Sequence, residues 1–338
     1  MLTVGFIGNG KSANRYHIPF ILQKSDKIKI KMIYTRKHSR DVWDEIPGVI
    51  YTEDLQELLN DQEVQVIIIS TPSQSHYELA KTVLNAGKNC VVEKPFTETL
   101  EEAKELYTLA KQKGVMIQCY QNRRFDSDFL TVQKVIESGK LGLLELEMHF
   151  DYYRPYIPES VHEFSQINSY LYGHGCHTLD QVISYFGKPD SIHYDVRQLL
   201  GVGRMNDYFD LDLYYGTLKV SVKSSYFRAK ERPSFIIYGK KGMFVKEKKD
   251  KQEEHLKMFY MPDHEDFGVD LPHEYGTLTY YDDNNQYHEE KVVSVNGDYG
   301  RYYDALYETL INGKEKLVKD EETLLQLRIL EEGIQGMK

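Results

Sequence analysis

The sequence predicts an α/β protein with an N-terminal Rossmann domain, built on a doubly wound parallel sheet, and a C-terminal α/β domain with a large, mostly antiparallel open sheet. Apolar β-branched runs alternate with helical patterns up to residue 121, and a glycine-rich turn follows the first run. From about residue 143, strand-like segments follow one another with few helices between them. A chain of 338 residues suits two domains, so we predict a dinucleotide-binding domain over 1–121 and a substrate-binding and oligomerisation domain over 122–338.

The first predicted strand, residues 3–7, leads into Gly8-Asn9-Gly10-Lys11-Ser12-Ala13, which has the spacing G-x-G-x-x-A. Glycines allow a tight turn and let backbone N–H groups approach a pyrophosphate. A helix predicted over 12–24 points its positive end at the same charge. Because glycine turns often follow strands, this motif alone does not decide between a dinucleotide site and an ordinary turn.

The next elements keep the alternation of strand and helix. We predict strands at 28–34, 64–70, 88–92 and 115–120, and helices at 51–60, 75–86 and 98–113, the last ending at Gly114. The almost unbroken apolar run at 64–70 is typical of a strand buried on both faces of a parallel sheet. In such a sheet the ligand crevice lies beyond the carboxyl ends of the strands. Two polar segments are expected there, Ser70-Thr71-Pro72 with His76, and Glu93-Lys94-Pro95.

The residues after the second strand bear on the cofactor. An acidic residue here would bind the ribose hydroxyls of NAD, but the strand runs into Thr35 and Arg36, and nothing acidic appears before Asp41. A guanidinium suits a 2′-phosphate through its charge and bidentate geometry. The sequence therefore favours NADP, with NAD possible; the alternative interpretation is a basic surface loop.

The C-terminal part alternates in strand fashion at 144–153, 210–227 and 234–245, with a helix predicted over 176–186. A sheet of this size needs both of its faces covered, and few helices are predicted to do so. We therefore expect its second face to pair with another subunit, in a homodimer or homotetramer. Most of the 27 tyrosines are expected to pack in strands and interfaces rather than touch a substrate.

Composition excludes several classes of protein. The net charge of −10 argues against nucleic acid as a partner, and no apolar run is long enough to span a membrane. No secretory signal is visible, so we expect a cytoplasmic protein. Cys90, Cys119 and Cys176 are far apart and never form a CxxC pair, which argues for reduced thiols and against a structural zinc site.

Several segments together resemble the Gfo/Idh/MocA family of oxidoreductases: GNGKSA, TPSQSH, VVEKPFTETLEEA, YQNRRFDSDFLTVQKVIESGKLG and GKPDSI. Two late segments, DYFDLDLYYG and VNGDYGRYYDALYETLINGK, are similar to one branch, the NADP-dependent scyllo-inositol dehydrogenases. The resemblance implies an NAD(P)-dependent oxidoreductase that transfers a hydride between the nicotinamide and a sugar, polyol or inositol-like substrate. The small-molecule partner follows from this resemblance, not from composition.

The resemblance also implies site residues. Lys94 matches the lysine of the family's EKP motif, which serves as acid or base beside the nicotinamide, and Pro95 restricts the backbone there. The alternative is a surface lysine that ends a strand. The residues expected to bind the cofactor are Gly8, Asn9, Gly10, Lys11, Thr35, Arg36, Thr71, Pro72, His76, Glu93 and Lys94. For His76 the alternative is an ordinary helix-start residue.

The segment LYGHGCHTLDQ, residues 171–181, carries the second half of the predicted site. His177 matches a family histidine that reaches the substrate, so Lys94 and His177 are the predicted acid–base pair. The family has an aspartate four residues before that histidine, but this chain has Gly173. His174 is either a partial substitute for the aspartate or a turn residue. Asp180 could hydrogen-bond His177, cap a helix or face solvent.

No metal is predicted in this segment. His174, Cys176 and His177 could share a helix face, but no third and fourth ligands follow at suitable spacing. Elsewhere, Asn122, Arg123 and Arg124 follow a strand end and suit a polyhydroxylated substrate or the cofactor. Arg123 and Arg124 could equally anchor an interdomain salt bridge.

Two further function classes stay open. The substitution at Gly173 suits a non-catalytic dinucleotide-binding regulator of the same fold, whereas the presence of both Lys94 and His177 favours an enzyme. A smaller possibility is redox-neutral chemistry through transient oxidation, as in the family's NAD-dependent glycosidases. No motif fixes the substrate.

Overall fold

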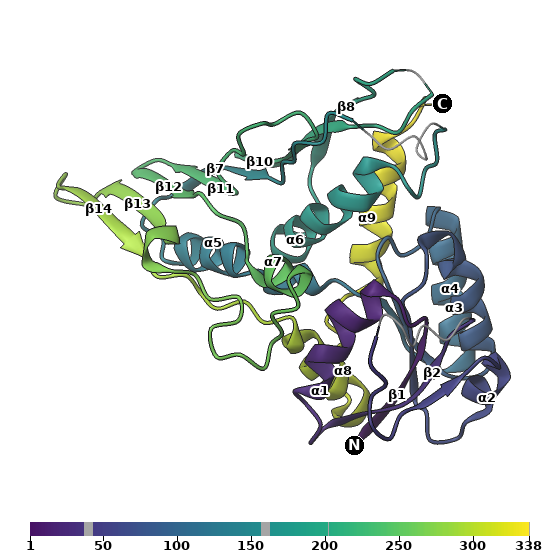
Figure 1. Ribbon diagram of the computed structural model, residues 1–338. Coiled ribbons are helices and arrows are strands. Elements are labelled where there is room, and N and C mark those ends of the chain that lie inside the picture. The colour runs from purple at the N-terminus through teal and green to yellow at the C-terminus, as the bar shows by residue number, and fades with distance from the viewer. Residues whose placement is uncertain (37–42, 157–162, 202, 338) are drawn as a thin grey trace. The chain divides into compact units, whose positions relative to one another are not determined.

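The computed structural model describes residues 1–36, 43–156, 163–201 and 203–337 (Figure 1). The chain divides into two compact units, each drawn from several segments. The first comprises Met1–Asn122, Glu254–Phe267 and Tyr299–Leu327; the second comprises Arg123–Glu253, Gly268–Asp298 and Arg328–Lys338. Two segments from the range predicted for the second domain thus fold into the first unit. The domain boundary after residue 121 stays a prediction.

The first unit contains a six-stranded parallel sheet in the order β3-β2-β1-β4-β5-β6. Its strands are β1 Leu2–Ile7, β2 Ile28–Tyr34, β3 Ile50–Thr52, β4 Val66–Ile69, β5 Asn89–Val92 and β6 Ile117–Cys119. The strand order reverses between β1 and β4, which is the topological switch point of a doubly wound sheet. All four residues of β4 are fully buried, as the apolar run predicts.

Helices cover both faces of this sheet. They are η1 Ala13–His17, α1 Ile18–Leu22, α2 Leu55–Asn60, η2 Ser73–Ser75, α3 His76–Asn85, α4 Leu100–Lys113 and α8 Gly300–Asn312. Figure 1 shows α3 and α4 on one side of the sheet and α1 and α8 on the other. Helix α4 begins with a capping box between Thr99 and Glu102 and ends at Gly114, whose φ of 67° is left-handed.

Two predicted helices differ from the structure. The range 51–60 splits into the end of strand β3 and helix α2, because Asp54 caps the helix by accepting from the amide of Gln56 at 2.8 Å. The predicted helix 12–24 stops at Leu22 and contains a π-helical stretch, η1. Single-turn π segments are rare and are often found at functional sites.

The second unit contains an eight-stranded sheet in the order β14-β13-β12-β11-β7-β10-β9-β8. Its strands are β7 Leu143–His149, β8 Ser191–Arg197, β9 Tyr208–Tyr215, β10 Leu218–Ser225, β11 Phe235–Gly239, β12 Gly242–Lys246, β13 Gly276–Tyr281 and β14 Tyr287–Val292. All neighbours are antiparallel except β7 and β10. The predicted fold class is therefore confirmed for both parts of the chain.

One face of this sheet is covered by helices α5 Ser127–Glu137 and α6 Cys176–Phe186, which Figure 1 shows on the same side. The remaining helical segments are η3 Asn122–Phe125, η5 Leu171–Gly175, α7 Gln252–Lys257, η6 Pro272–Glu274 and α9 Asp320–Gly333. None of the described helices is long and apolar enough to cross a membrane.

The opposite face of the eight-stranded sheet is called the outer face below. Directly paired residues of neighbouring strands point to the same side of a sheet, so the register defines its rows. One row contains Glu147, Ile236, Val245 and Thr277, and the next contains Glu145, Tyr238, Met243 and Thr279. The alternate residues, such as Leu146 and Phe244, are fully buried under the helices.

Candidate functional site

The glycine-rich turn after β1 contains two glycines with different surroundings, Gly8 and Gly10. Gly8 has a φ of 109°, and a Cβ there would lie 2.7 Å from the carbonyl oxygen of Ser70, so no other residue fits without strain. A Cβ on the exposed Gly10 would meet nothing within 4 Å, which leaves room for a ligand. The side-chain amide of Asn14 holds the turn by donating to Asn9 Oδ1 at 2.9 Å and to the Gly10 carbonyl at 3.0 Å. The exposed Lys11 follows directly.

The ends of β4 and β5 lie beside this turn. Ser70 Oγ donates to the Gly8 carbonyl at 3.3 Å, and the next residue, Thr71, shares a 2.7 Å hydrogen bond with Ser75. Beyond the exposed Pro72, His76 is almost fully buried, with Nε2 3.0 Å from the Thr71 carbonyl and Nδ1 2.8 Å from the Pro95 carbonyl.

His76 therefore connects the loop after β4 to the loop that carries Lys94. Burial lowers the pKa of His76, although its backbone hydrogen bonds act in the opposite direction. His76 is the first residue of α3, as the helix-start alternative expects, and its ring also connects these two loops. Its contact with a cofactor stays a prediction.

Four side chains form a cluster, called the Glu93 network below, at the end of β5. Glu93 Oε1 accepts hydrogen bonds from Ser12 Oγ and from His17 Nε2, the latter at 2.9 Å, and Glu93 Oε2 accepts from the Lys94 amide at 3.0 Å. His17 Nδ1 lies 2.5 Å from the Tyr303 hydroxyl. Burial acts to raise the pKa of Glu93, but the hydrogen bond and charge of His17 and the charge of Lys94 outweigh it and lower that pKa to about 2. Glu93 is thus an anchored carboxylate directly before the half-buried Lys94.

The end of β2 offers a cation where the adenosine ribose binds in such folds. Thr35 is buried, and its amide donates to the Thr52 carbonyl at 3.0 Å. Arg36 follows and is exposed. The rest of the basic segment, through Asp41, lies outside the described residues.

In the second unit, the segment LYGHGCHTLDQ forms the π-helical η5, which runs directly into α6. His177 is buried with 8% of its surface exposed, and His174 is half-buried. Gly173 does not have a positive φ, and a Cβ there would meet nothing within 4 Å. By contrast, a Cβ on Gly175 would lie 2.7 Å from Leu171 Cδ1, so close packing explains that glycine.

His174 belongs to an aromatic cluster that the sequence analysis missed. Its ring centroid lies 4.6 Å from that of Tyr170, 5.0 Å from that of Tyr152 and 6.1 Å from that of Tyr226. The Arg154 guanidinium lies 4.5 Å from the Tyr152 ring centroid. These rings come from separate parts of the chain, so only their contacts distinguish them among 27 tyrosines.

The arginines after β6 are engaged in ion pairs within the second unit. Arg124 donates from Nε and Nη2 to the two carboxylate oxygens of Asp180, at 2.8 and 2.7 Å. Arg123 contacts Asp126 at 3.3 Å and also Glu253. Asp180 is buried, which rules out the solvent-exposed alternative. The structure therefore supplies partners for the salt-bridge interpretation, although all three bridges lie inside one unit.

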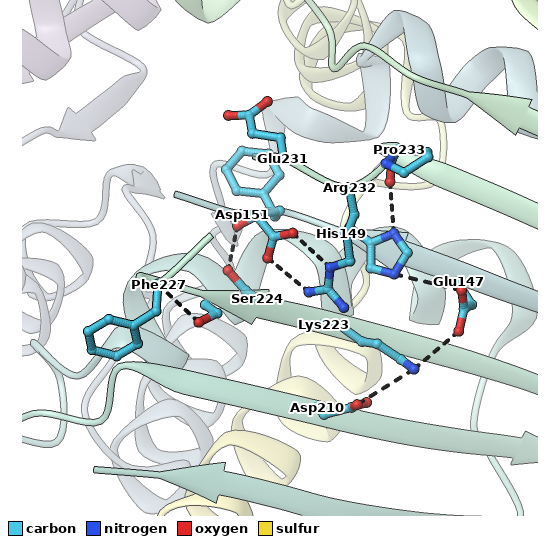
Figure 2. A network of polar contacts seen from close by, with 12 residues as sticks. Glu147, His149, Asp151, Asp210, Lys223, Ser224, Phe227, Glu231, Arg232 and Pro233 are labelled. Carbon is cyan, nitrogen blue, oxygen red and sulfur yellow. Dashed lines mark hydrogen bonds and ion pairs between the residues drawn. The ribbon is translucent and has the colours of Figure 1, made fainter. Parts of the chain in front are cut away.

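A second polar cluster lies on the outer face (Figure 2). Arg232 contacts both carboxylate oxygens of Asp151, at 2.8 and 2.9 Å, and Lys223 contacts Glu147 at 3.1 Å and Asp210 at 3.6 Å. Because charges on this face are paired, it can be brought against another surface at a lower desolvation cost than unpaired charges would incur.

The described residues include no group of three or more His, Cys, Asp or Glu side chains that could hold a metal ion. Cys90, Cys119 and Cys176 are all buried free thiols.

Comparison with known proteins identifies the family. The model of an oxidoreductase family with an NAD-binding Rossmann fold, GFO_IDH_MocA, matches residues 2–121. The model of the same family's C-terminal alpha/beta domain matches residues 133–338. The chain belongs to the Gfo/Idh/MocA oxidoreductase family. The resemblance inferred from the motifs is thereby confirmed.

Similar members of the Gfo/Idh/MocA family cover nearly the whole chain. The uncharacterized oxidoreductase YhhX of Escherichia coli is 45% identical over 99% of this chain and 96% of that protein. The scyllo-inositol 2-dehydrogenase (NADP(+)) IolW of Bacillus subtilis is 33% identical over 100% of this chain and 94% of its own length. The crystal structure of an oxidoreductase from Bacillus cereus is 47% identical and has a TM-score of 0.92, over 98% of this chain and 95% of that one.

Proposed function

We propose that this Gfo/Idh/MocA protein is an NADP-dependent dehydrogenase or reductase that acts on a sugar, polyol or inositol-like ring. The observation that carries the proposal is the anchored segment Glu93-Lys94 at the carboxyl end of β5. The Lys94 amide donates to Glu93, and Glu93 also accepts from Ser12 of the glycine-rich turn, which follows β1 at the switch point of the parallel sheet. The similarity to IolW supports this class of substrate.

The residues of the first unit fit a dinucleotide. The turn Gly8–Lys11 would hold the pyrophosphate, with Thr71 and Pro72 beside it, and Arg36 would pair with a 2′-phosphate. When bound, the nicotinamide supplies the acceptor or donor of the hydride. Thr35, His76 and Glu93 support the loops around this site.

Lys94 is proposed to move the proton of the substrate hydroxyl, and His177 is a proposed contact to the substrate. Asn122, Arg123 and His174 are proposed substrate contacts. For His174, the surrounding tyrosine rings support a role beside a polyhydroxylated ring, because aromatic faces pack against its C–H groups. For Arg123, the existing ion pairs limit the hydrogen bonds left for a substrate.

A panel of inositols, aldoses, polyols and their keto forms, assayed by nicotinamide absorbance with both cofactors, tests the proposal. We expect turnover with at least one ring substrate and tighter binding of NADP(H) than NAD(H) in calorimetric titrations. Lys94→Met should lower turnover by about a hundredfold or more while cofactor affinity changes only a few-fold. Arg36→Asp should abolish the preference for NADP. Near-native turnover of Lys94→Met would overturn the proposed mechanism.

A dinucleotide-binding regulator is the second candidate, and Gly173 is the observation that favours it. The position has room for a side chain, yet this chain lacks the family's aspartate there. If the panel yields no substrate while NADP(H) binds tightly, the regulator interpretation is preferred.

We also propose that the protein is a homodimer or homotetramer formed through the outer face. That face combines paired charges at its centre with the half-buried side chains of Ile236, Met243 and Val245 and the exposed ring of Tyr238. An apolar patch beside neutralised charges suits a surface that a second copy covers.

A further inference from the structure

A chain of buried hydrogen bonds runs from α8 to the backbone of Lys94 and passes through two residues that the sequence analysis did not single out. His17 and Tyr303 are both completely buried. His17 packs against Tyr120, with ring centroids 4.0 Å apart and the rings tilted by 31°, so its ring is held by packing as well as at its two nitrogens. Two adjacent tyrosines of α8 have different hydrogen-bond partners. The Tyr303 hydroxyl bonds to His17, whereas the Tyr302 hydroxyl donates to the Cys119 carbonyl at 3.0 Å.

The direction of these hydrogen bonds follows from their chemistry. An ionised carboxylate can only accept, so His17 Nε2 carries a proton and donates it to Glu93. At its other nitrogen, Nδ1, the ring shares a hydrogen bond with the Tyr303 hydroxyl. Burial raises the pKa of Tyr303 well above its usual value, so this hydroxyl keeps its proton and stays a donor. Each member of the chain thus fixes the orientation of the next.

The last member acts on Lys94. Glu93 Oε2 accepts from the Lys94 amide, while Glu93 Oε1 is held by His17 and by Ser12 of the glycine-rich turn. The backbone of Lys94 is therefore tied to the same turn that would hold the pyrophosphate. A small displacement of a reacting group lowers the rate strongly, on the order of a hundredfold for about 1 Å.

We propose that His17 and Tyr303 are positioning residues, which hold Glu93 and through it set the place of Lys94 relative to the glycine-rich turn. This inference rests on the proposed function, because it assumes that Lys94 is the proton-transfer group. Neither residue contacts the proposed substrate in this role. Tyr303 comes from the late segment Tyr299–Leu327, which belongs to the first unit together with His17 and Glu93.

Tyr303→Phe tests the inference, with Tyr302→Phe as the matched control. Both substitutions remove one buried hydroxyl from α8, but only the first hydroxyl bonds to the Glu93 network. We expect Tyr303→Phe to lower kcat about tenfold with the dissociation constant of NADP(H) unchanged within about threefold. Tyr302→Phe should leave kcat within about twofold of the wild type.

The pH profile separates positioning from a merely structural role. When His17 loses its fixed orientation, Glu93 loses the donor that opposes the effect of burial, so its pKa should rise. The acid limb of the kcat–pH profile should therefore move to higher pH in Tyr303→Phe. The same shift is expected in His17→Phe, which keeps an aromatic ring at this position but removes both ring nitrogens. A variant that is only less stable would keep the position of the limb.

A second readout does not depend on turnover. Lysines are labelled by reductive ¹³C-methylation, and the NMR signal of Lys94 is assigned by its loss in Lys94→Arg. The chemical shift of this signal should change in Tyr303→Phe and stay the same in Tyr302→Phe. If the signal moves equally, or not at all, in both variants, the inference is wrong. Suppose that Lys94→Met is inactive, but Tyr303→Phe and Tyr302→Phe have the same kcat and the same acid limb in their pH profiles. The positioning role is then wrong, while the proposed function stands. If Lys94→Met stays active, the proposed function fails instead.

Discussion

At the scale of single residues, the four glycines of the glycine-rich turn and of the segment LYGHGCHTLDQ differ in what surrounds them. Gly8 is required by its left-handed φ and its approach to Ser70, and Gly175 by its contact with Leu171. Gly10 and Gly173 have open space where a Cβ would be. At Gly10 that space suits the approach of a pyrophosphate. At Gly173 no packing or backbone requirement of the described residues demands a glycine.

This freedom leads to a prediction for Gly173→Asp. We expect the variant to fold, because neither a positive φ nor a close neighbour opposes the side chain. If the protein is an enzyme, activity on ring polyols should rise about threefold or more, since a carboxylate four residues before His177 lies near the same helix face and can orient its imidazole. His177→Ala should lower the same activity. Steady-state kinetics on the best substrate of the panel checks both variants.

Equal activity of Gly173→Asp and wild type, with no loss in His177→Ala, would show that this segment does not serve the reaction. Circular dichroism and cofactor titration provide the control, because both variants must be folded and must bind the cofactor before their kinetics are compared. Gly175→Asp is the matched negative variant, since its side chain would clash with Leu171.

At the scale of elements, periodicity and caps predicted most of the secondary structure. The strand at 28–34 and the helix at 176–186 have the predicted bounds, and the capping box and Gly114 set the ends of α4. Strand β3 was missed because its three residues are too few for a periodic pattern. The π-helical segments η1 and η5 were missed because a π turn leaves no pattern distinct from an α-helix in a single sequence.

The candidate site residues also divide into those that a sequence pattern marks and those that only spatial contacts reveal. Candidate residues on strand ends and in motifs, such as Gly8 and Lys94, could be proposed from their place in the sequence. His17, Tyr303 and the tyrosines around His174 could not, because their role depends on contacts between segments far apart in the chain. For Arg124 the sequence offered two alternatives, and only the contact with Asp180 shows which partner it has.

The start of α5 carries a prediction about pH. Asp128 is buried, and burial together with the like charge of Asp250 raises its pKa to about 6. A carboxyl group whose folded-state pKa is raised stabilises the fold below its unfolded pKa of about 4, and this contribution is lost as the pH rises through about 6. Asp128→Asn removes the charge, so it should raise the free energy of unfolding near pH 8 by up to about 2 to 3 kcal/mol.

Urea unfolding at about pH 5 and about pH 8 checks this prediction, because the gain should be much smaller at the lower pH. The exposed Glu137 lies on the same helix, and Glu137→Gln serves as the control that changes charge without relieving burial. A loss of stability at both pH values in Asp128→Asn would contradict the prediction. It would mean that the hydrogen bonds of the carboxylate stabilise the fold more than burial and the repulsion from Asp250 destabilise it.

At the scale of the whole molecule, the chain passes between its two units several times, so neither unit is a continuous segment. The late segment around α8 completes the core of the first unit, and the strands after residue 143 build the second. The eight-stranded sheet buries one face under α5 and α6 and presents the outer face, where the charges of Figure 2 are paired and Ile236 and Val245 are half-buried. Full burial of these apolar side chains requires a partner surface.

We therefore expect size-exclusion chromatography with light scattering to give a mass two or four times 39.6 kDa. Val245→Glu should lower that mass, because a twofold interface contains each substituted position twice and a buried unpaired carboxylate is costly. Leu199→Glu, which places the same charge at a residue that is 53% exposed outside the strands, should leave the mass unchanged. A wild-type protein that is monomeric at micromolar concentration would refute the proposed interface. Loss of the oligomer in Leu199→Glu with retention in Val245→Glu would instead place the contact away from the outer face.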